Sequence, residues 1–190
     1  RDFRDNFARE LWDSIGDKGD VSVFSTSEII IAIVVLLIIG AIFYIKDNFK
    51  ALLTYHILLI LGTVVLAVST LMFQTRMLDP FVWMVCTGFG LYICYVPFNC
   101  LFFDRFIATF KVKGNSGFLI YIADAFGYVG SILVLLYKNF GQANLSWLNF
   151  FVYGTYAVAF IGICSTIILF IHFASRRKAE QLNNQLDYGK

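Results

Sequence analysis

Long apolar stretches alternate with short polar segments along most of the chain. Each stretch is long enough to cross a bilayer as a helix, which takes about 20 residues. The expected complete spans lie at about residues 26–46, 51–73, 80–106, 116–138 and 147–174. The pattern predicts an all-α fold, a polytopic transmembrane helical bundle of five complete spans that follows a truncated helical start.

Polar segments at the two ends frame this bundle. Residues 1–20 are polar but carry an apolar residue at every fourth position, the spacing of one helix face. Those apolar residues are Phe3, Phe7, Leu11 and Ile15. We expect either a surface amphipathic helix or the end of a truncated membrane helix with an extracytoplasmic segment. Residues 21–175 then form the five-span bundle, and residues 176–190 a loose polar tail in the cytoplasm.

Local signals mark where some of these helices begin or bend. Ser25 and Glu28 have the spacing of a capping box, which predicts a helix start just before the first span. Asp79 and Pro80 predict the start of the third span, because proline is favoured in the first turn of a helix. Pro97 lies inside that span and should kink it, because proline has no backbone N–H to donate. The backbone carbonyl groups that lose their partner can then bind a substrate or water.

An ionisable residue, Asp124, lies near the middle of the fourth span. A charge at membrane depth is costly unless it faces protein or water, so Asp124 should face a partner helix or a cavity. The residues that share its helix stripe are Gly117, Tyr121, Tyr128, Ser131 and Lys138. A second stripe, on the third span, consists of Gly88, Tyr92, Tyr95 and Asn99.

The composition favours an integral membrane protein over other classes. Hydrophobic residues make up 59% of the chain and charged residues only 15%, against about 25% charged in soluble domains. The net charge of +2 provides no basic surface for nucleic acid. We find no metal-binding, cofactor-binding or catalytic motif, and we expect no enzyme activity and no cofactor. The cysteines are expected to be small core residues; they are Cys86, Cys94, Cys100 and Cys164.

His56 is the ionisable residue of the second span, close to the connection that carries Lys46 and Lys50. We expect an interfacial histidine, and a proton relay is the alternative. Small residues on the fourth and last spans predict close packing against other helices. These small residues are Ala123, Gly127, Ser131, Gly154, Ala157, Gly162 and Ser165.

Lysine and arginine residues are unevenly distributed between the two sides of the predicted bundle. The richer side holds residues 46–50, 105–113 and 176–190, and the acidic residues of 1–20 offset the basic ones on the other side. The positive-inside rule places the richer side, with the C-terminus, in the cytoplasm.

Four runs of the sequence resemble a known group of proteins. The runs are RDFRDNFARELW, VSVFSTSEI, GLYICYVPFNCLFFDRFIATF and GNSGFLIYIADAFGYVGS. They are similar to a family of uncharacterised bacterial multi-pass membrane proteins related to the major facilitator superfamily. The five spans and the helical start resemble the second half of such a transporter, from late in its seventh helix. The superfamily's Asp-Arg loop signature does not occur between residues 40 and 50, so the resemblance rests on topology and on these runs.

The resemblance implies half of a secondary transporter for a small polar solute, coupled to protons or cations through Asp124, in the bacterial inner membrane. The chain begins with Arg and looks like part of a longer protein, so its expected partners are the lipid bilayer and a missing N-terminal half. The solute would pass between the two halves. The candidate residues that line this path are Asp124, Tyr121, Tyr128, Tyr92, Tyr95, Asn99, Asp2, Arg4, Asp5 and Asn6.

Two other interpretations stay open. Asp124 could serve only as a lock between helices, for instance through Tyr92 or Tyr95. The chain could also be a non-transporting assembly or sensor protein built on a transporter fold, in which the small residues of the fourth and last spans form a partner interface.

Overall fold

The structure is a computed structural model that describes residue 4 and residues 8–15, 21–141 and 146–188. The predicted all-α fold is confirmed, since the described residues form helices joined by short connections. Five of the described helical stretches are long and apolar enough to cross a membrane. They are Ser22–Phe43, Asn48–Gln74, Pro80–Phe110, Ser116–Gly141 and Trp147–Ser175.

Some of these spans combine more than one helical element. The elements in chain order are α2 (Ala8–Ile15), α3 (Val21–Phe43), α4 (Asn48–Gln74), α5 (Pro80–Pro97), η1 (Phe98–Phe102), α6 (Phe103–Phe110), α7 (Ser116–Leu136), η2 (Tyr137–Gly141) and α8 (Trp147–Tyr188). η1 and η2 are π-helices, and η1 joins α5 and α6 into the third span.

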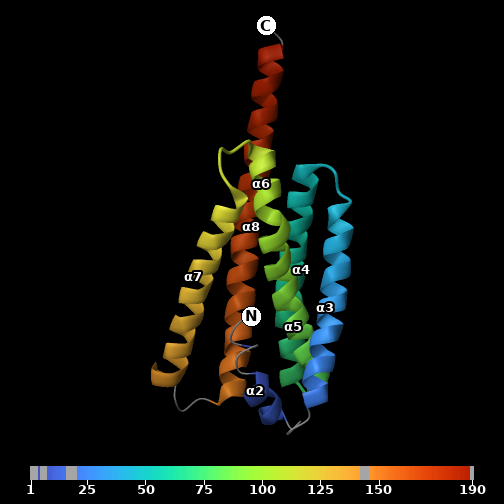
Figure 1. The fold of residues 1–190 in the computed structure, drawn as a ribbon, viewed down its shortest axis with the longest axis vertical. Coiled ribbons are helices and arrows are strands. Elements are labelled where there is room, and N and C mark those ends of the chain that lie inside the picture. The colour runs from blue at the N-terminus through green and yellow to red at the C-terminus, as the bar shows by residue number, and fades with distance from the viewer. Residues whose placement is uncertain (1–3, 5–7, 16–20, 142–145, 189–190) are drawn as a thin grey trace.

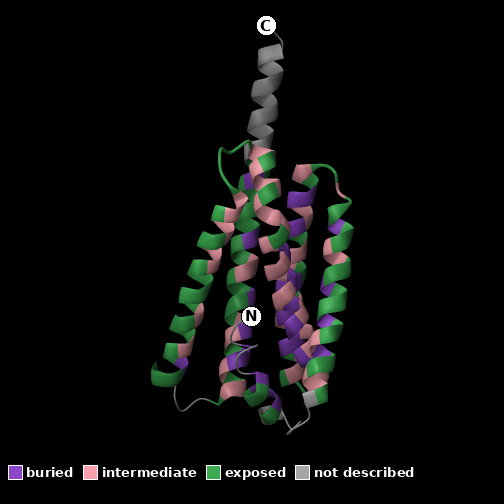
Figure 2. Cartoon of the chain, in the orientation of Figure 1, coloured by how far each residue is buried: buried purple, intermediate pink, exposed green. Residues whose placement is uncertain are grey.

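Consecutive spans run in opposite directions (Figure 1). α4 packs most extensively against α5 and α8, and α3 packs against α5. Apart from η2, which continues it, α7 contacts mainly α6. Figure 2 shows exposed residues along most of α7, whereas buried residues concentrate on α4 and α5. The core of the bundle therefore lies around α4 and α5, and α7 contributes little to it.

The short helix α2 lies at the end of the bundle opposite the C-terminus (Figure 1). Its inner face is buried and its outer face is exposed, so the helix is amphipathic. The buried residues are Ala8, Leu11 and Trp12, which form one core cluster with Trp83, Met84, Phe151 and Val152. The predicted apolar spacing is thus seen at Leu11, while Phe3 and Phe7 lie outside the described residues.

Two glycines allow α4 and α5 to approach each other closely. A Cβ atom at Gly62 would lie 2.9 Å from the carbonyl oxygen of Gly90, and a Cβ atom at Gly90 would lie 2.8 Å from the carbonyl oxygen of Gly62. Both obstacles are backbone atoms, which cannot turn aside as a flexible side chain can. The contact between the two helices therefore depends on the absence of a side chain at both positions.

Buried hydrogen bonds link α4, α5 and α8. The indole N–H of Trp83 donates to Thr70 Oγ1 over 3.2 Å. The hydroxyl of Thr155 donates to the carbonyl oxygen of Val152 over 2.8 Å and lies 3.2 Å from the hydroxyl of Thr70. Because the Thr155 proton is directed at Val152, Thr70 is the donor to Thr155. The network therefore runs in one direction, from Trp83 through both threonines to Val152.

We predict that Thr70→Val lowers the free energy of unfolding by about 1 to 2 kcal/mol. Valine keeps the shape of threonine but removes the acceptor for Trp83 and the donor to Thr155, and a hydrogen bond between membrane helices is worth about 0.6 kcal/mol on average. Equilibrium unfolding in mixed micelles measures the change. Thr26→Val is the matched control, because that exposed hydroxyl bonds only within its own helix. An equal loss in both variants would mean that the network adds no stability.

The first span begins earlier than its sequence predicts. α3 starts at Val21, so Ser25 lies inside the helix and the predicted capping box is wrong. The hydroxyls of Thr26 and Ser27 instead donate to backbone carbonyl oxygens one turn back, over 2.7 Å and 2.8 Å. Asp79 does cap α5 as predicted, since its carboxylate accepts from the backbone N–H of Phe81 at 2.9 Å.

The predicted loose tail at residues 176–190 is wrong for residues 176–188. α8 is continuous from Trp147 to Tyr188 and extends beyond the other helices (Figure 1). The tail is rich in Ala, Lys, Glu, Gln and Leu, which favour helix. The membrane-spanning part of α8 also provides a formed helix, so the tail needs only propagation and not a new nucleus.

Two predictions about burial also fail. His56 is only 1% exposed and faces the protein interior, so its side chain is not interfacial. Cys100 and Cys164 are exposed, whereas Cys86 and Cys94 are half-buried, and none of the four forms a disulfide. The reason is the same in both cases: an apolar segment shows that a residue lies in the membrane, but not which side of its helix meets protein.

Candidate functional site

Asp124 on α7 accepts two hydrogen bonds from the third span. The hydroxyl of Tyr95 lies 3.3 Å from Asp124 Oδ1, and Asn99 Nδ2 lies 3.1 Å from the same oxygen. Both donors are neutral, and no cation among the described residues forms an ion pair with Asp124. The amide oxygen of Asn99 is buried and has no hydrogen-bond partner in the described part of the chain. The site therefore presents a half-buried carboxylate beside an unused acceptor.

The position of Asn99 follows from Pro97. Proline has no backbone N–H and cannot continue an α-helical hydrogen-bond ladder, and α5 ends at this residue. The π-helix η1 follows at once and contains Asn99. The N–H of Phe98 bonds to the carbonyl of Tyr95, which leaves the Cys94 carbonyl free to accept from the hydroxyl of Tyr55 at 3.2 Å. The Cys94 carbonyl at this bend thus binds a tyrosine hydroxyl of α4.

The other predicted tyrosines do not join this cluster. Tyr92 packs against the buried apolar residues that α3 and α5 share, next to Ile31 and Ile93. Tyr121 and Tyr128 lie on the exposed surface of α7, at 78% and 59% exposure. The structure therefore brings together Asp124, Tyr95 and Asn99, and leaves the two α7 tyrosines facing outward.

Arg4, another predicted site residue, lies elsewhere. Its side chain is buried, and Arg4 Nη2 lies 2.8 Å from Glu28 Oε1 on α3 and 3.4 Å from the carbonyl oxygen of Met84 on α5. Met84 and Asn99 are fifteen residues apart on one span, or about 22 Å along a helix. Arg4 and Asp124 are thus held at different levels of the third span. Asp2, Asp5 and Asn6 lie outside the described residues.

Gly88 makes room for this buried arginine. A Cβ atom at Gly88 would lie 2.8 Å from Arg4 Nη2 and would overlap a methyl carbon of Ile31. The sequence placed Gly88 on a polar stripe, and the structure shows that it accommodates the guanidinium group. The partner of Arg4 was missed, because Glu28 matched a helix-cap pattern. Glu28 lies at the start of an apolar span, and a charged residue at that position could have indicated a buried ion pair.

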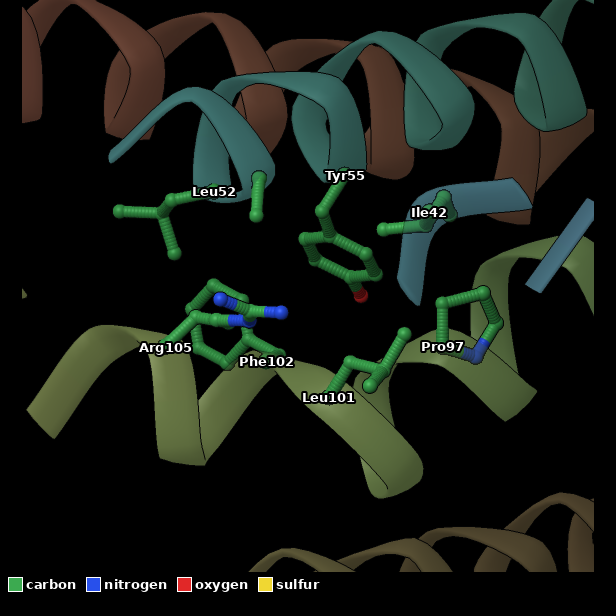
Figure 3. A pocket seen from close by; sticks show the side chains of 8 residues that line it. Ile42, Leu52, Tyr55, Pro97, Leu101, Phe102 and Arg105 are labelled. Atoms are coloured by element: carbon green, nitrogen blue, oxygen red, sulfur yellow. The ribbon is translucent and has the colours of Figure 1, made fainter. Parts of the chain in front are cut away.

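A small cavity lies between α3, α4 and the third span (Figure 3). Its volume is about 10 Å³, which is room for a single water molecule. The ring of Tyr55 points into it and faces Pro97, Leu101 and Phe102 from across the cavity, with Arg105 at one side (Figure 3). A solute larger than water does not fit there, so this cavity is not the solute site.

Residues 1–176 match a protein family described as a family of unknown function, DUF5690. The chain belongs to the DUF5690 family. The match covers α2, all five spans and the site at Asp124, so these features lie within the DUF5690 region. No curated protein and no solved structure matches the chain. The DUF5690 family carries no assigned substrate or activity.

Proposed function

We propose that this DUF5690 chain forms the second half of a secondary transporter of the major facilitator type, which carries a small polar solute. The proposal rests mainly on Asp124, a carboxylate within a membrane span. It accepts hydrogen bonds from two neutral side chains, and no cation among the described residues forms an ion pair with it. Ionisable residues at membrane depth are rare and commonly mark substrate or ion paths. The π-helix beside the site is a further feature that occurs frequently at functional sites.

The chemistry of the site favours a particular kind of ligand. Asp124 and the amide oxygen of Asn99 are both acceptors, and the oxygen of Asn99 is buried without a partner among the described residues. Two acceptors attract a cation or a hydrogen-bond donor. The proposed ligands are therefore a proton or metal cation for coupling, and a solute with an amino or hydroxyl group.

The rest of the solute path would come from the other half of the transporter. Tyr121 and Tyr128 flank Asp124 on α7 and are exposed, so they would line the face that the other half covers. The cavity at Tyr55 has room for only one water molecule, so the proposed solute would not pass through it.

We place the protein in the bacterial inner membrane with its C-terminus in the cytoplasm. The connections from α3 to α4 and from α6 to α7 lie at the same end of the bundle as the C-terminus (Figure 1). Lys46, Lys50, Lys111 and Lys113 are exposed on or beside these connections. An excess of basic residues on one side supports the cytoplasmic assignment.

We predict that Asp124→Asn abolishes coupled uptake by the full-length protein in vesicles. Asparagine keeps the size of the side chain but removes the charge that a proton or cation would neutralise. The vesicles contain a pH-sensitive dye and are offered a mixture of small amines and amino acids, and mass spectrometry identifies what enters. Asp104→Asn, an exposed carboxylate on α6, is the matched control and should transport normally. Unchanged uptake by Asp124→Asn would remove this residue from the mechanism.

A second candidate function is an assembly or sensor role on the same fold. The observation in its favour is that added Cβ atoms at Gly127, Gly130 and Gly154 would have nothing within 4 Å, so these small residues of α7 and α8 are not used for packing among the described residues. Faces with small residues suit contact with another membrane helix. A stable protein that co-purifies, together with no stabilisation by any small solute, would favour this role over transport.

A further inference from the structure

His56 lies in the core where α4, the third span and α8 meet. It is 1% exposed, and four aromatic rings surround it. Its ring centroid lies 5.9 Å from that of Tyr55 on α4 and 6.2 Å from that of Phe102 on η1. On α8, the centroids of Phe170 and Phe173 lie at 6.3 Å and 5.5 Å. Each of the three spans therefore contributes at least one ring to the surroundings of this imidazole.

The hydrogen bonding of the imidazole fixes its neutral form. His56 Nδ1 lies 2.7 Å from the carbonyl oxygen of Leu52. A carbonyl oxygen only accepts, so Nδ1 carries the hydrogen and Nε2 carries the lone pair in the neutral ring. Nε2 is buried and has no hydrogen-bond partner in the described part of the chain. A buried acceptor without a partner is uncommon and calls for an explanation.

A proton suits this position better than a water molecule does. A buried water needs two to four polar partners, and of the four rings around His56 only Tyr55 carries a polar group, whose proton is already donated to the Cys94 carbonyl. A proton needs no space, and the faces of aromatic rings attract a cation.

The titratable and charged groups of the helices that pack around this ring leave Nε2 open. On α4 the group is Tyr55, whose hydroxyl donates to the Cys94 carbonyl. On α6 it is Arg105, which donates to Asn48 over 2.7 Å. On α8 it is His172, whose ring lies 5.9 Å from that of Phe173. Among the described residues, none of these groups forms a hydrogen bond or an ion pair with His56.

We propose that His56 is a proton-binding site, at which Nε2 takes up a proton from the acidified solvent when the packed helices open transiently, and the ring becomes an imidazolium ion enclosed by aromatic rings. The new charge lies where three spans pack together, so its arrival changes the contact between α4, η1 and α8. η1 carries both Phe102, which contacts His56, and Asn99, which holds Asp124. A role of this proton in coupling rests on the proposed transport function, whereas proton binding itself does not.

The test follows the imidazole nitrogens by NMR in the full-length protein, labelled with nitrogen-15 at histidine and placed in nanodiscs. His56→Phe identifies the signal, because phenylalanine should fit the aromatic surroundings. If that variant does not fold, His56→Gln, which keeps an N–H donor for the carbonyl oxygen of Leu52, identifies the signal instead. We expect the Nε2 signal to move from the unprotonated to the protonated position as the pH falls, while Nδ1 stays protonated.

A Nε2 signal that stays unprotonated at every pH at which the protein remains folded would overturn the proposal, as would one that stays protonated throughout. The NMR result is independent of transport, so it stands even if no solute is carried. If solute is carried, His56→Phe should still bind it but should lose at least tenfold in the proton movement that accompanies uptake. Unchanged proton movement would show that His56 takes no part in coupling.

Discussion

Gly90→Val should lower the free energy of unfolding by about 3 kcal/mol. Valine is a better helix former than glycine by a few tenths of a kcal/mol, so helix propensity alone predicts a small gain. The close contact with α4 outweighs that gain, because the new Cβ would lie 2.8 Å from the carbonyl oxygen of Gly62 and 2.7 Å from Leu66. Relief requires the two helices to separate, and overpacking of this kind costs about 1 to 3 kcal/mol or more.

The control for this substitution is Gly40→Val on α3. Gly40 is exposed, and a Cβ there would have nothing within 4 Å. The same exchange of residues at this position should therefore leave stability unchanged or slightly increased. Equilibrium unfolding of both variants in mixed micelles separates the effect of helix packing on stability from the effect of helix propensity. Similar stability for Gly90→Val and Gly40→Val would contradict the close approach of α4 and α5.

Glu28→Gln should lower the free energy of unfolding by about 2 kcal/mol. Glu28 lies 2.8 Å from the guanidinium group of Arg4, whose side chain is 1% exposed. Glutamine keeps the shape but removes the negative charge, so a buried cation loses an anionic partner. Breaking a fully buried pair costs about 3 to 5 kcal/mol. We expect less here, because the Glu28 side chain is 29% exposed and water compensates part of the loss.

Asp13→Asn on α2 serves as the control for Glu28→Gln. Asp13 is exposed, and the loss of an exposed charge typically changes stability by less than about 1 kcal/mol. Thermal unfolding of both variants over a range of salt concentrations measures the difference. If the two variants were equally stable, the ion pair between Arg4 and Glu28 would not contribute to the free energy of unfolding.

The membrane-spanning architecture was predictable from sequence because lipid imposes a simple rule. A helix must present about 20 apolar residues to cross, and this requirement is visible along the chain without any knowledge of packing. The start of α5 was predictable for a related reason, since the Asp79 cap and Pro80 act within one turn. Both of these signals are local and both predictions are confirmed, whereas the equally local Ser25–Glu28 pattern predicted a cap that the structure does not have.

Contacts between helices were not predictable in the same way. In a membrane span almost every residue is apolar, so hydropathy cannot distinguish the face that meets lipid from the face that meets protein. Gly62 and Gly90 are each other's closest backbone obstacle, yet no local pattern pairs them. The same ambiguity produced the errors at Cys100, Cys164 and His56.

The candidate site was predicted in part. A charged side chain in a membrane span needs hydrogen-bond donors or water, so partners for Asp124 were expected. Tyr95 and Asn99, on the polar stripe of the third span, are the donors that the structure shows. The stripe of α7 was read as one polar face, but Tyr121 and Tyr128 are exposed, because few residues of the chain cover α7. Which residues complete the site depends on what lies against that helix.

Melting temperatures of the full-length protein and of Asp124→Asn, with and without small amines, amino acids and sodium ions, distinguish a ligand site at Asp124 from a lock between helices. A ligand that binds the native state raises its stability by mass action. If Asp124 binds a transported solute or its coupling ion, at least one of these ligands stabilises the native sequence and fails to stabilise Asp124→Asn. A variant that melts lower but keeps the full ligand-induced shift would contradict it, because Asp124 would then be only a lock between α7 and the third span.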